Sequence, residues 1–188
     1  MAMRVSTAYR LVRYSHTEVA GASCLNAEAE DRVIDRIRGQ GIQTSGVVVR
    51  VCDGDCIVVS GTLGIKRVRL LGIDGPELWH PTRGTESRAS ESREALVKLA
   101  YGRRVVMIGD SFQPAHDRYG RWLSWVIRQD DEMIVNLEMV REGWAWATPW
   151  WPNALRVVLK LAEIEARRSG LGLWGGEKPS MVIDVRNT

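Results

Sequence analysis

The chain of 188 residues is 45% hydrophobic and 26% charged. That balance is typical of one folded domain with a modest extension, and it excludes a chain that is disordered throughout. Charged residues or glycines interrupt every apolar run before it reaches the roughly 18 residues of a membrane-spanning helix, so we expect no membrane span. The three cysteines are too few for the disulfide framework of a small secreted protein. The net charge of +3 would not repel a polyanionic partner, but it does not establish one.

The N-terminal residues, 1–43, are predicted to form an extension with one short helix. Residues 1–17 contain arginines and hydroxyls but no acidic residue, a composition shared by mitochondrial presequences and by ordinary frayed bacterial N-termini. No apolar run of about 7 to 15 residues follows, so a secretory signal is not expected. The compartment stays unknown, with the cytoplasm as the default and a mitochondrial presequence as the minor alternative.

The helix of the extension is expected to begin at Asn26, a capping residue, and to stop at Gly39. Its narrow apolar stripe consists of Ala29, Val33, Ile34 and Ile37. A stripe of this width favours docking on the chain's own main domain, with a lid or a dimer contact as the alternative. We therefore expect a monomer, and a dimer through this helix is the second option.

The main domain is expected between residues 44 and 175, where short β-branched runs precede segments with helical periodicity. The runs that predict strands are 47–51, 57–59, 65–71, 104–108 and 121–127. The segments that predict helices are 90–100, 135–142 and 153–168. Short strands with a helix inserted after the third and helices after the fifth fit an α+β fold with a small closed antiparallel barrel. The tail, 176–188, has no clear period and is expected to be loosely ordered.

Three carboxylates fall at predicted strand ends and turns rather than on helix surfaces: Asp55, Asp74 and Glu77. Calcium prefers such carboxylates together with backbone carbonyls, and the turn at Gly75 and Pro76 would expose carbonyls. Asp-Gly-Asp at 53–55 is also an ordinary hairpin connection that needs no metal. The pattern alone leaves both interpretations open.

Two arginines stand at unusual places in the predicted strands. Arg69 lies inside the third strand, where Val, Ile or Thr would be more usual, and Arg121 begins the fifth. A guanidinium held by a rigid strand can bind two phosphate oxygens at once. The alternative for each is an edge-strand charge that faces water.

Six short motifs occur in a fixed order along the chain. They are Asp53-Gly54-Asp55, the run Arg69-Leu70-Leu71-Gly72-Ile73-Asp74-Gly75-Pro76-Glu77, His80-Pro81, Asp117-Arg118-Tyr119-Gly120-Arg121, Val135-Asn136 and Glu142-Gly143. Over roughly residues 45–174, their order and spacing closely resemble the staphylococcal nuclease (thermonuclease) family. The resemblance implies an OB-type five-stranded barrel with three helices, which agrees with the predicted order of elements.

The resemblance implies a metal-dependent endonuclease, a hydrolase that cuts the phosphodiester bonds of DNA and possibly RNA with little sequence specificity. The products would carry 3′-phosphate ends. One calcium ion would be the cofactor, although other divalent ions are an option. By the same resemblance, the carboxylates of Asp55 and Asp74 would bind the ion, and Gly75 would offer its backbone carbonyl.

The resemblance also assigns catalytic roles to three residues. Glu77 would align or deprotonate the attacking water, and Arg69 and Arg121 would bind the scissile phosphate. Arg121 would also assist the departing 5′-oxygen. A cation and two fixed guanidinium groups suit the charge that develops on the phosphate oxygens during this reaction.

Substrate-binding positions follow from the resemblance as well. Arg118 and Tyr119 would grip a terminal phosphate and pack against the nucleotide, and Arg83 stands where a loop lysine is usual. Trp150 roughly replaces a tyrosine that contacts the nucleotide. For the neighbouring Trp144 and Trp146, the alternative is that they fill the groove between barrel and helices.

The chain departs from the family pattern at Cys56 and Gly75, where threonine is common. Glycine keeps the carbonyl ligand, but we expect a looser loop that weakens metal binding or changes the preferred ion. Cys52 and Cys56 flank the Asp-Gly-Asp motif and suggest either a zinc site, a redox switch or simply small buried thiols.

Two other functions compete with the nuclease. The first is an OB-type nucleic-acid-binding module whose catalysis has lapsed, which loss of a metal carboxylate, the base or a catalytic arginine would favour. None of these residues is lost. The second is an interaction scaffold that dimerises through the N-terminal helix.

Overall fold

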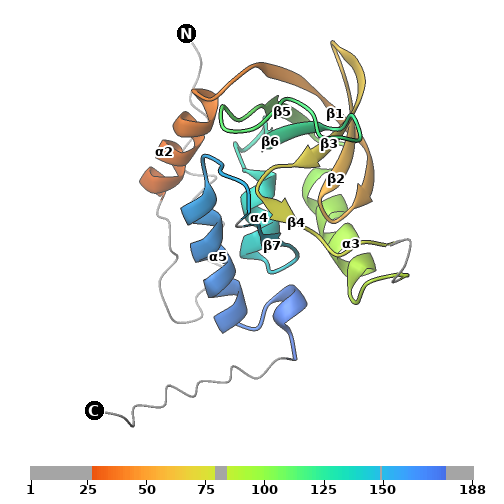
Figure 1. Cartoon of the computed structure of the whole chain (residues 1–188), viewed down its shortest axis with the longest axis vertical. Helices are drawn as coiled ribbons and strands as arrows, with labels where there is room; N and C mark the ends of the chain where they lie inside the picture. Colours follow the sequence, from red (N-terminus) through yellow and green to blue (C-terminus); the bar gives the residue numbers. More distant parts are fainter. Residues whose placement is uncertain (1–26, 79–83, 149, 177–188) are drawn as a thin grey trace.

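The computed structural model describes residues 27–78, 84–148 and 150–176 (Figure 1). The expectations for residues 1–17, for Arg83 and for the tail after 176 lie outside the described residues. A β-barrel forms one part of the molecule, and helices pack against it (Figure 1). No helix within the described segments has the length and hydropathy that crossing a bilayer requires.

The barrel is closed by five strands in the order β1-β2-β3-β6-β5. They are β1 (Gln43–Asp53), β2 (Cys56–Gly61), β3 (Gly64–Leu70), β5 (Arg104–Ile108) and β6 (Trp122–Arg128). The predicted α+β barrel is confirmed. The expected antiparallel pairing fails at one seam, because β3 and β6 run parallel, with Val68 opposite Trp122. Parallel neighbours cannot be joined by a tight hairpin, and here a helix and two further strands lie between them in the chain.

The helices follow the predicted periodicity closely. They are α2 (Ala27–Arg38), α3 (Ala89–Ala100), α4 (Val135–Arg141) and α5 (Arg156–Arg168), and a 3-10 turn spans Gly172–Trp174. Helix α5 begins three residues later than predicted from the Asn153 cap. The Asn153 side chain still accepts a hydrogen bond from the backbone nitrogen of Leu155 at 3.1 Å, as a capping residue does, but it stabilises the turn that precedes the helix.

One short pair of strands was not predicted. β4 (Ile73–Asp74) pairs antiparallel with β7 (Trp146–Ala147), so Asp74 lies opposite Trp146. Two-residue strands contain no alternation of apolar and polar residues, and for that reason periodicity does not reveal them. The pairing with β7 fixes the position of Asp74 relative to the end of β3.

The hydrophobic core fills the barrel and continues beneath the helices. Its largest fully buried side chains include Ile57, Leu70, Leu96, Trp125, Met139 and Leu159. The Trp125 indole nitrogen donates to Asp110 at 2.9 Å, so the one polar atom of this ring is satisfied.

Asn136 of helix α4 is fully buried and joins β3 to β6. Its amide nitrogen donates to the carbonyls of Leu71 at 2.9 Å and Ser124 at 3.2 Å, and its oxygen accepts from Val126 at 2.9 Å. A buried amide with all three bonds made holds its neighbours in one arrangement. The end of β3 is therefore firmly placed.

Helix α2 docks on the chain's own domain. Val33, Ile34 and Ile37 are buried in the same core cluster as the barrel residues. Arg38 pairs with Glu132 at 2.6 Å beside this contact. The burial agrees with the docking interpretation of the apolar stripe, whereas the oligomeric state stays a prediction.

Replacing Ile37 by alanine tests the docking of α2. Ile37 is fully buried, so we expect Ile37→Ala to lower the free energy of unfolding by about 2–5 kcal/mol. Ile42, which is 83% exposed, provides the control, and Ile42→Ala should change the free energy of unfolding by no more than about 0.5 kcal/mol. Urea unfolding at two protein concentrations measures both variants. Equal stabilities would contradict the docked position of α2.

Candidate functional site

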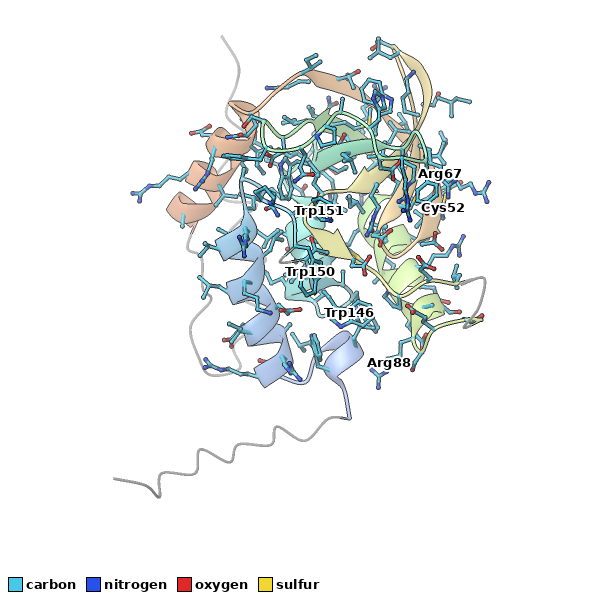
Figure 2. All side chains as sticks on the ribbon, in the orientation of Figure 1. Cys52, Arg67, Arg88, Trp146, Trp150 and Trp151 are labelled. Atoms are coloured by element: carbon cyan, nitrogen blue, oxygen red, sulfur yellow. The ribbon has the colours of Figure 1, made fainter. Side chains whose placement is uncertain are left out.

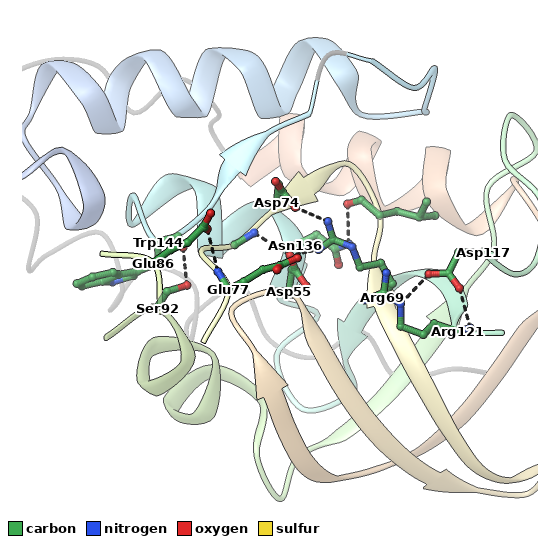
Figure 3. Close-up of polar contacts among 12 residues, drawn as sticks. Asp55, Arg69, Asp74, Glu77, Glu86, Ser92, Asp117, Arg121, Asn136 and Trp144 are labelled. Carbon is green, nitrogen blue, oxygen red and sulfur yellow. Dashed lines mark hydrogen bonds and ion pairs between the residues drawn. The ribbon is translucent and has the colours of Figure 1, made fainter. Parts of the chain in front are cut away.

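The site begins at the turn between β1 and β2. Asp53 pairs with Cys56, so only Gly54 and Asp55 connect the strands. A Cβ atom on Gly54 would collide with the hydroxyl of Ser92 in α3, and glycine therefore lets the turn rest on the helix. The Ser92 hydroxyl donates to the carbonyl of Trp144 at 2.7 Å (Figure 3). The turn is thus seated on α3, and Asp55 is only 6% exposed.

Asp55 and Asp74 converge on one guanidinium group (Figure 3). Arg69, on β3 opposite Cys56, forms an ion pair with Asp55 through Nη1 and donates from Nη2 to Asp74 Oδ1 at 2.5 Å. Asp55 Oδ2 also accepts a hydrogen bond from the backbone nitrogen of Gly75 at 2.8 Å. Two loops that are far apart in sequence are held together through these contacts.

The burial of this cluster makes the pairing necessary. The side chain of Arg69 is 17% exposed, and burial lowers the pKa of its guanidinium while the charge of Asp74 opposes that change. Arginine stays charged even so. A buried carboxylate such as Asp55 requires a compensating cation, and in the described structure Arg69 supplies it.

The donor set of Asp55, Asp74 and Gly75 fits a hard cation. Two carboxylates that already share one positive group, beside a backbone segment with a carbonyl, offer only oxygen ligands, as calcium prefers. Within the described ranges, no three His, Cys, Asp or Glu side chains gather into a metal cluster. A cation held by both carboxylates would compete with Arg69 for their oxygens.

Gly75 packs directly on the Asp-Gly-Asp turn. A Cβ atom built on Gly75 would lie 2.8 Å from the carbonyl carbon of Gly54 and 2.9 Å from its Cα. Such a contact with backbone cannot be relieved by rotating a side chain. The expectation of a looser loop at Gly75 does not agree with this packing, because the absence of a side chain here permits a tight contact.

The backbone of Glu77 is clamped by Glu86. The nitrogen of Glu77 donates to Glu86 Oε2 at 3.0 Å, and the nitrogen of Glu86 donates to the carbonyl of Glu77 at 3.0 Å (Figure 3). The carboxylate of Glu77 remains exposed. Sequence reasoning did not single out Glu86, since nothing in its local pattern distinguishes it from a surface glutamate.

Arg121 is held by Asp117 at the turn before β6. Its Nε donates to Asp117 Oδ2 at 2.6 Å, and the backbone nitrogens of Arg121 and Tyr119 each donate to Asp117 Oδ1 at 2.9 Å. Burial alone would raise the pKa of Asp117, but the hydrogen bonds from Arg121 and Tyr119 lower it. Asp117 is thus an orienting group for which sequence analysis named no role.

Two guanidinium groups contact the ring of Tyr119. The Cζ atom of Arg118 lies 4.8 Å from the ring centroid, and that of Arg121 lies 5.6 Å from it. Arg118 also donates to the Tyr119 hydroxyl at 2.6 Å. The ring is 67% exposed, so it offers a face to a ligand next to two positive charges.

The tryptophans after helix α4 have different environments. Trp144 is partly buried against the core, in agreement with the groove-filling interpretation. Trp150, at 81% exposure, and Trp151 extend from the segment before α5 (Figure 2). Trp150 makes no described contact with Asp55, Arg69 or Asp74, so its substrate role stays a prediction.

Comparison with known proteins finds relatives that share sequence with most of this chain. The family model described as staphylococcal nuclease homologue matches residues 67–176. The chain is 31% identical over 139 residues to a thermonuclease of Staphylococcus intermedius, covering 73% of this chain and 78% of that protein. Identity to a micrococcal nuclease of Shigella flexneri is 35% over 136 residues, with 69% and 72% covered. An uncharacterized endonuclease of Escherichia coli O157:H7 is 37% identical over 134 residues, with 71% and 79% covered.

A methyl group at position 75 tests the close contact of the two loops. We expect Gly75→Ala to lower the free energy of unfolding by about 1–3 kcal/mol, because the added Cβ meets the backbone of Gly54. Gly109→Ala is the matched control, since no atom lies within 4 Å of a Cβ there. Denaturant unfolding of both variants provides the comparison. A stable Gly75→Ala beside a stable control would show that the loops can separate without cost.

The lowered pKa of Asp117 predicts a pH-dependent contribution to stability. Its carboxylate stabilises the fold fully above the unfolded value of about 3.9, and the contribution disappears as the pH falls through the lower folded value. Asp117→Asn should therefore lower the free energy of unfolding by about 1–3 kcal/mol at neutral pH and by progressively less below about pH 4. Thermal unfolding over a pH series measures this, with exposed Asp35→Asn as the control. A cost that stays constant with pH would refute the assignment.

Proposed function

The chain belongs to the staphylococcal nuclease family, and from that premise we propose that it is a calcium-dependent nuclease that hydrolyses DNA and RNA with little sequence specificity. The observation that carries the proposal is the convergence of Asp55 and Asp74 on Arg69. Relatives named thermonuclease, micrococcal nuclease and endonuclease support the reaction class.

Asp55 and Asp74, with the carbonyl of Gly75, are the residues that would hold the calcium ion. When bound, calcium supplies positive charge to the phosphate oxygens on which negative charge develops. The chain's own part is to keep two carboxylates together on rigid elements, through the seated turn and the end of β3.

Arg69 and Arg121 are proposed to bind the scissile phosphate. Both guanidinium groups project from strand positions or strand ends, and Asp117 fixes the orientation of Arg121. Donors that are already oriented stabilise the developing charge without reorganisation during the reaction. Arg121 is also proposed to assist the departing 5′-oxygen.

Glu77 is proposed to accept a proton from the attacking water. Its side chain is exposed, and its backbone nitrogen is held by Glu86. The carboxylate can therefore reach a water molecule while the backbone of Glu77 stays in place. The water oxygen bonds to phosphorus, the bond from phosphorus to the 5′-oxygen breaks, and the departing 5′-oxygen takes up a proton from solvent. The products then carry 3′-phosphate and 5′-hydroxyl ends.

Tyr119, Arg118 and Trp150 are proposed to contact the nucleotide. Stacking of a base on an exposed aromatic ring contributes about 1–3 kcal/mol and does not depend strongly on the base. The exposed rings of Tyr119 and Trp150 therefore suit a nuclease with low sequence preference.

Replacing the proposed base tests the function. We expect the chain to cut plasmid, single-stranded DNA and RNA with calcium and to stop with EDTA, and we expect Glu77→Gln to slow cutting about 10²–10⁴-fold. Glu94→Gln, an exposed residue of α3, is the matched control and should cut normally. Gel assays with calcium, magnesium or EDTA measure the rates.

The same assay distinguishes the competing function. Protein that binds these nucleic acids but cuts none with any divalent ion would be a binding module whose catalysis has lapsed. Cutting that Glu77→Gln leaves unchanged would remove Glu77 from the mechanism.

A further inference from the structure

The outer face of the barrel carries a third arginine beside the two proposed catalytic ones. Alternate residues of a strand share a face, so Arg67 and Arg69 both point outward while Val68 between them is fully buried inside. Arg67 pairs with Val58 of β2, and Val58 pairs with Arg50 of β1. Arg67 and Arg50 are both exposed in this cross-strand row.

Arg121 lies next to Arg67. Trp122 is opposite Val68 in the parallel seam, so the preceding Arg121 is at the level of Arg67. The charges of Arg67 and Arg121 both act on the thiol of Cys56, which lies directly opposite Arg69. Three guanidinium groups therefore surround one short stretch of β2.

The three arginines differ in how their charge is balanced. Arg69 contacts two carboxylates, and Arg121 contacts Asp117. Arg67 instead lies opposite Val58 on the outer face of the barrel, two residues along β2 from the buried Cys56. Asp53 acts on Arg67 from a greater distance, and no carboxylate of the described residues lies within 4 Å of it. Figure 2 shows Arg67 beside Cys52 on the outside of the barrel.

We propose that Arg67 binds a second phosphate of the nucleic-acid chain, adjacent to the scissile phosphate at Arg69 and Arg121. This inference rests on the proposed function, since it takes the same site as its starting point. Same-face residues of a strand are about 6.6 Å apart, a separation similar to that of successive phosphates in an extended single strand. Arg50 continues the positive surface in the same row.

The proposal requires that Arg67 distinguishes long substrates from short ones. A dinucleotide has one internal phosphate, and this phosphate would bind to the two catalytic arginines. A longer strand presents the neighbouring phosphate to Arg67. The alternative is a solvated surface arginine that contributes no more than any other positive charge.

Binding of labelled oligothymidylates tests this in the Glu77→Gln background with calcium, so that cleavage does not interfere. For a twelve-nucleotide strand, Arg67→Gln should reduce the slope of log affinity against log salt by about 0.7, which is roughly fivefold in affinity at about 0.1 M salt. Binding of the dinucleotide should not change. Arg67→Lys should keep the slope, and thermal unfolding checks that the variants fold.

Arg168→Gln, an exposed arginine of α5, is the matched control for net charge. Equal effects of Arg67→Gln and Arg168→Gln, or equal losses for the twelve-nucleotide strand and the dinucleotide, would overturn the proposal. So would the absence of any binding to the longer strand. If the unsubstituted chain binds as expected but never cuts, the proposed function fails while the second phosphate position stands.

Discussion

The ion pairs of Arg69 with Asp55 and Asp74 are the interaction on which the site depends. A carboxylate as buried as Asp55 would cost several kcal/mol without a cation. The barrel supplies that cation from β3, and Asn136 fixes the end of the strand. The turn that carries Asp55 is in turn fixed on α3. The two carboxylates can lie close together because the positive charge of their shared guanidinium offsets their mutual repulsion.

The proposed function implies that the cation and the substrate act together on Arg69. The guanidinium that neutralises both carboxylates is also the group proposed to bind phosphate. A metal ion that binds the two carboxylates would neutralise their negative charge in place of Arg69. The guanidinium would then be available to bind the phosphate of the substrate. By linkage, each ligand would then favour the binding of the other. Arg121, whose ion pair is with Asp117, would take no part in this exchange.

Much of this arrangement could be predicted from sequence. The sequence placed the strand at 104–108 and the helix at 90–100 almost to the residue, since the first is a compact apolar run and the second repeats its apolar residues at helical spacing. Resemblance in ordered motifs identified the family. The parallel seam at Val68, the contact of Gly75 with the turn and the clamp at Glu86 could not be predicted. Each depends on contacts between segments that are distant in sequence, and local sequence patterns carry no information about such contacts.

The contact between Gly54 and Gly75 has a consequence for engineering. A Cβ on Gly75 would meet the backbone of Gly54, so no repacking of neighbouring side chains can make room for a larger residue there, whereas a Cβ on Gly54 would meet the side chain of Ser92. Grafting the carboxylates and arginines onto another barrel would therefore transfer the functional groups without the spacing between their loops. The two glycines would have to be moved as a pair with the residues they bring together, although they contribute no functional side chain themselves.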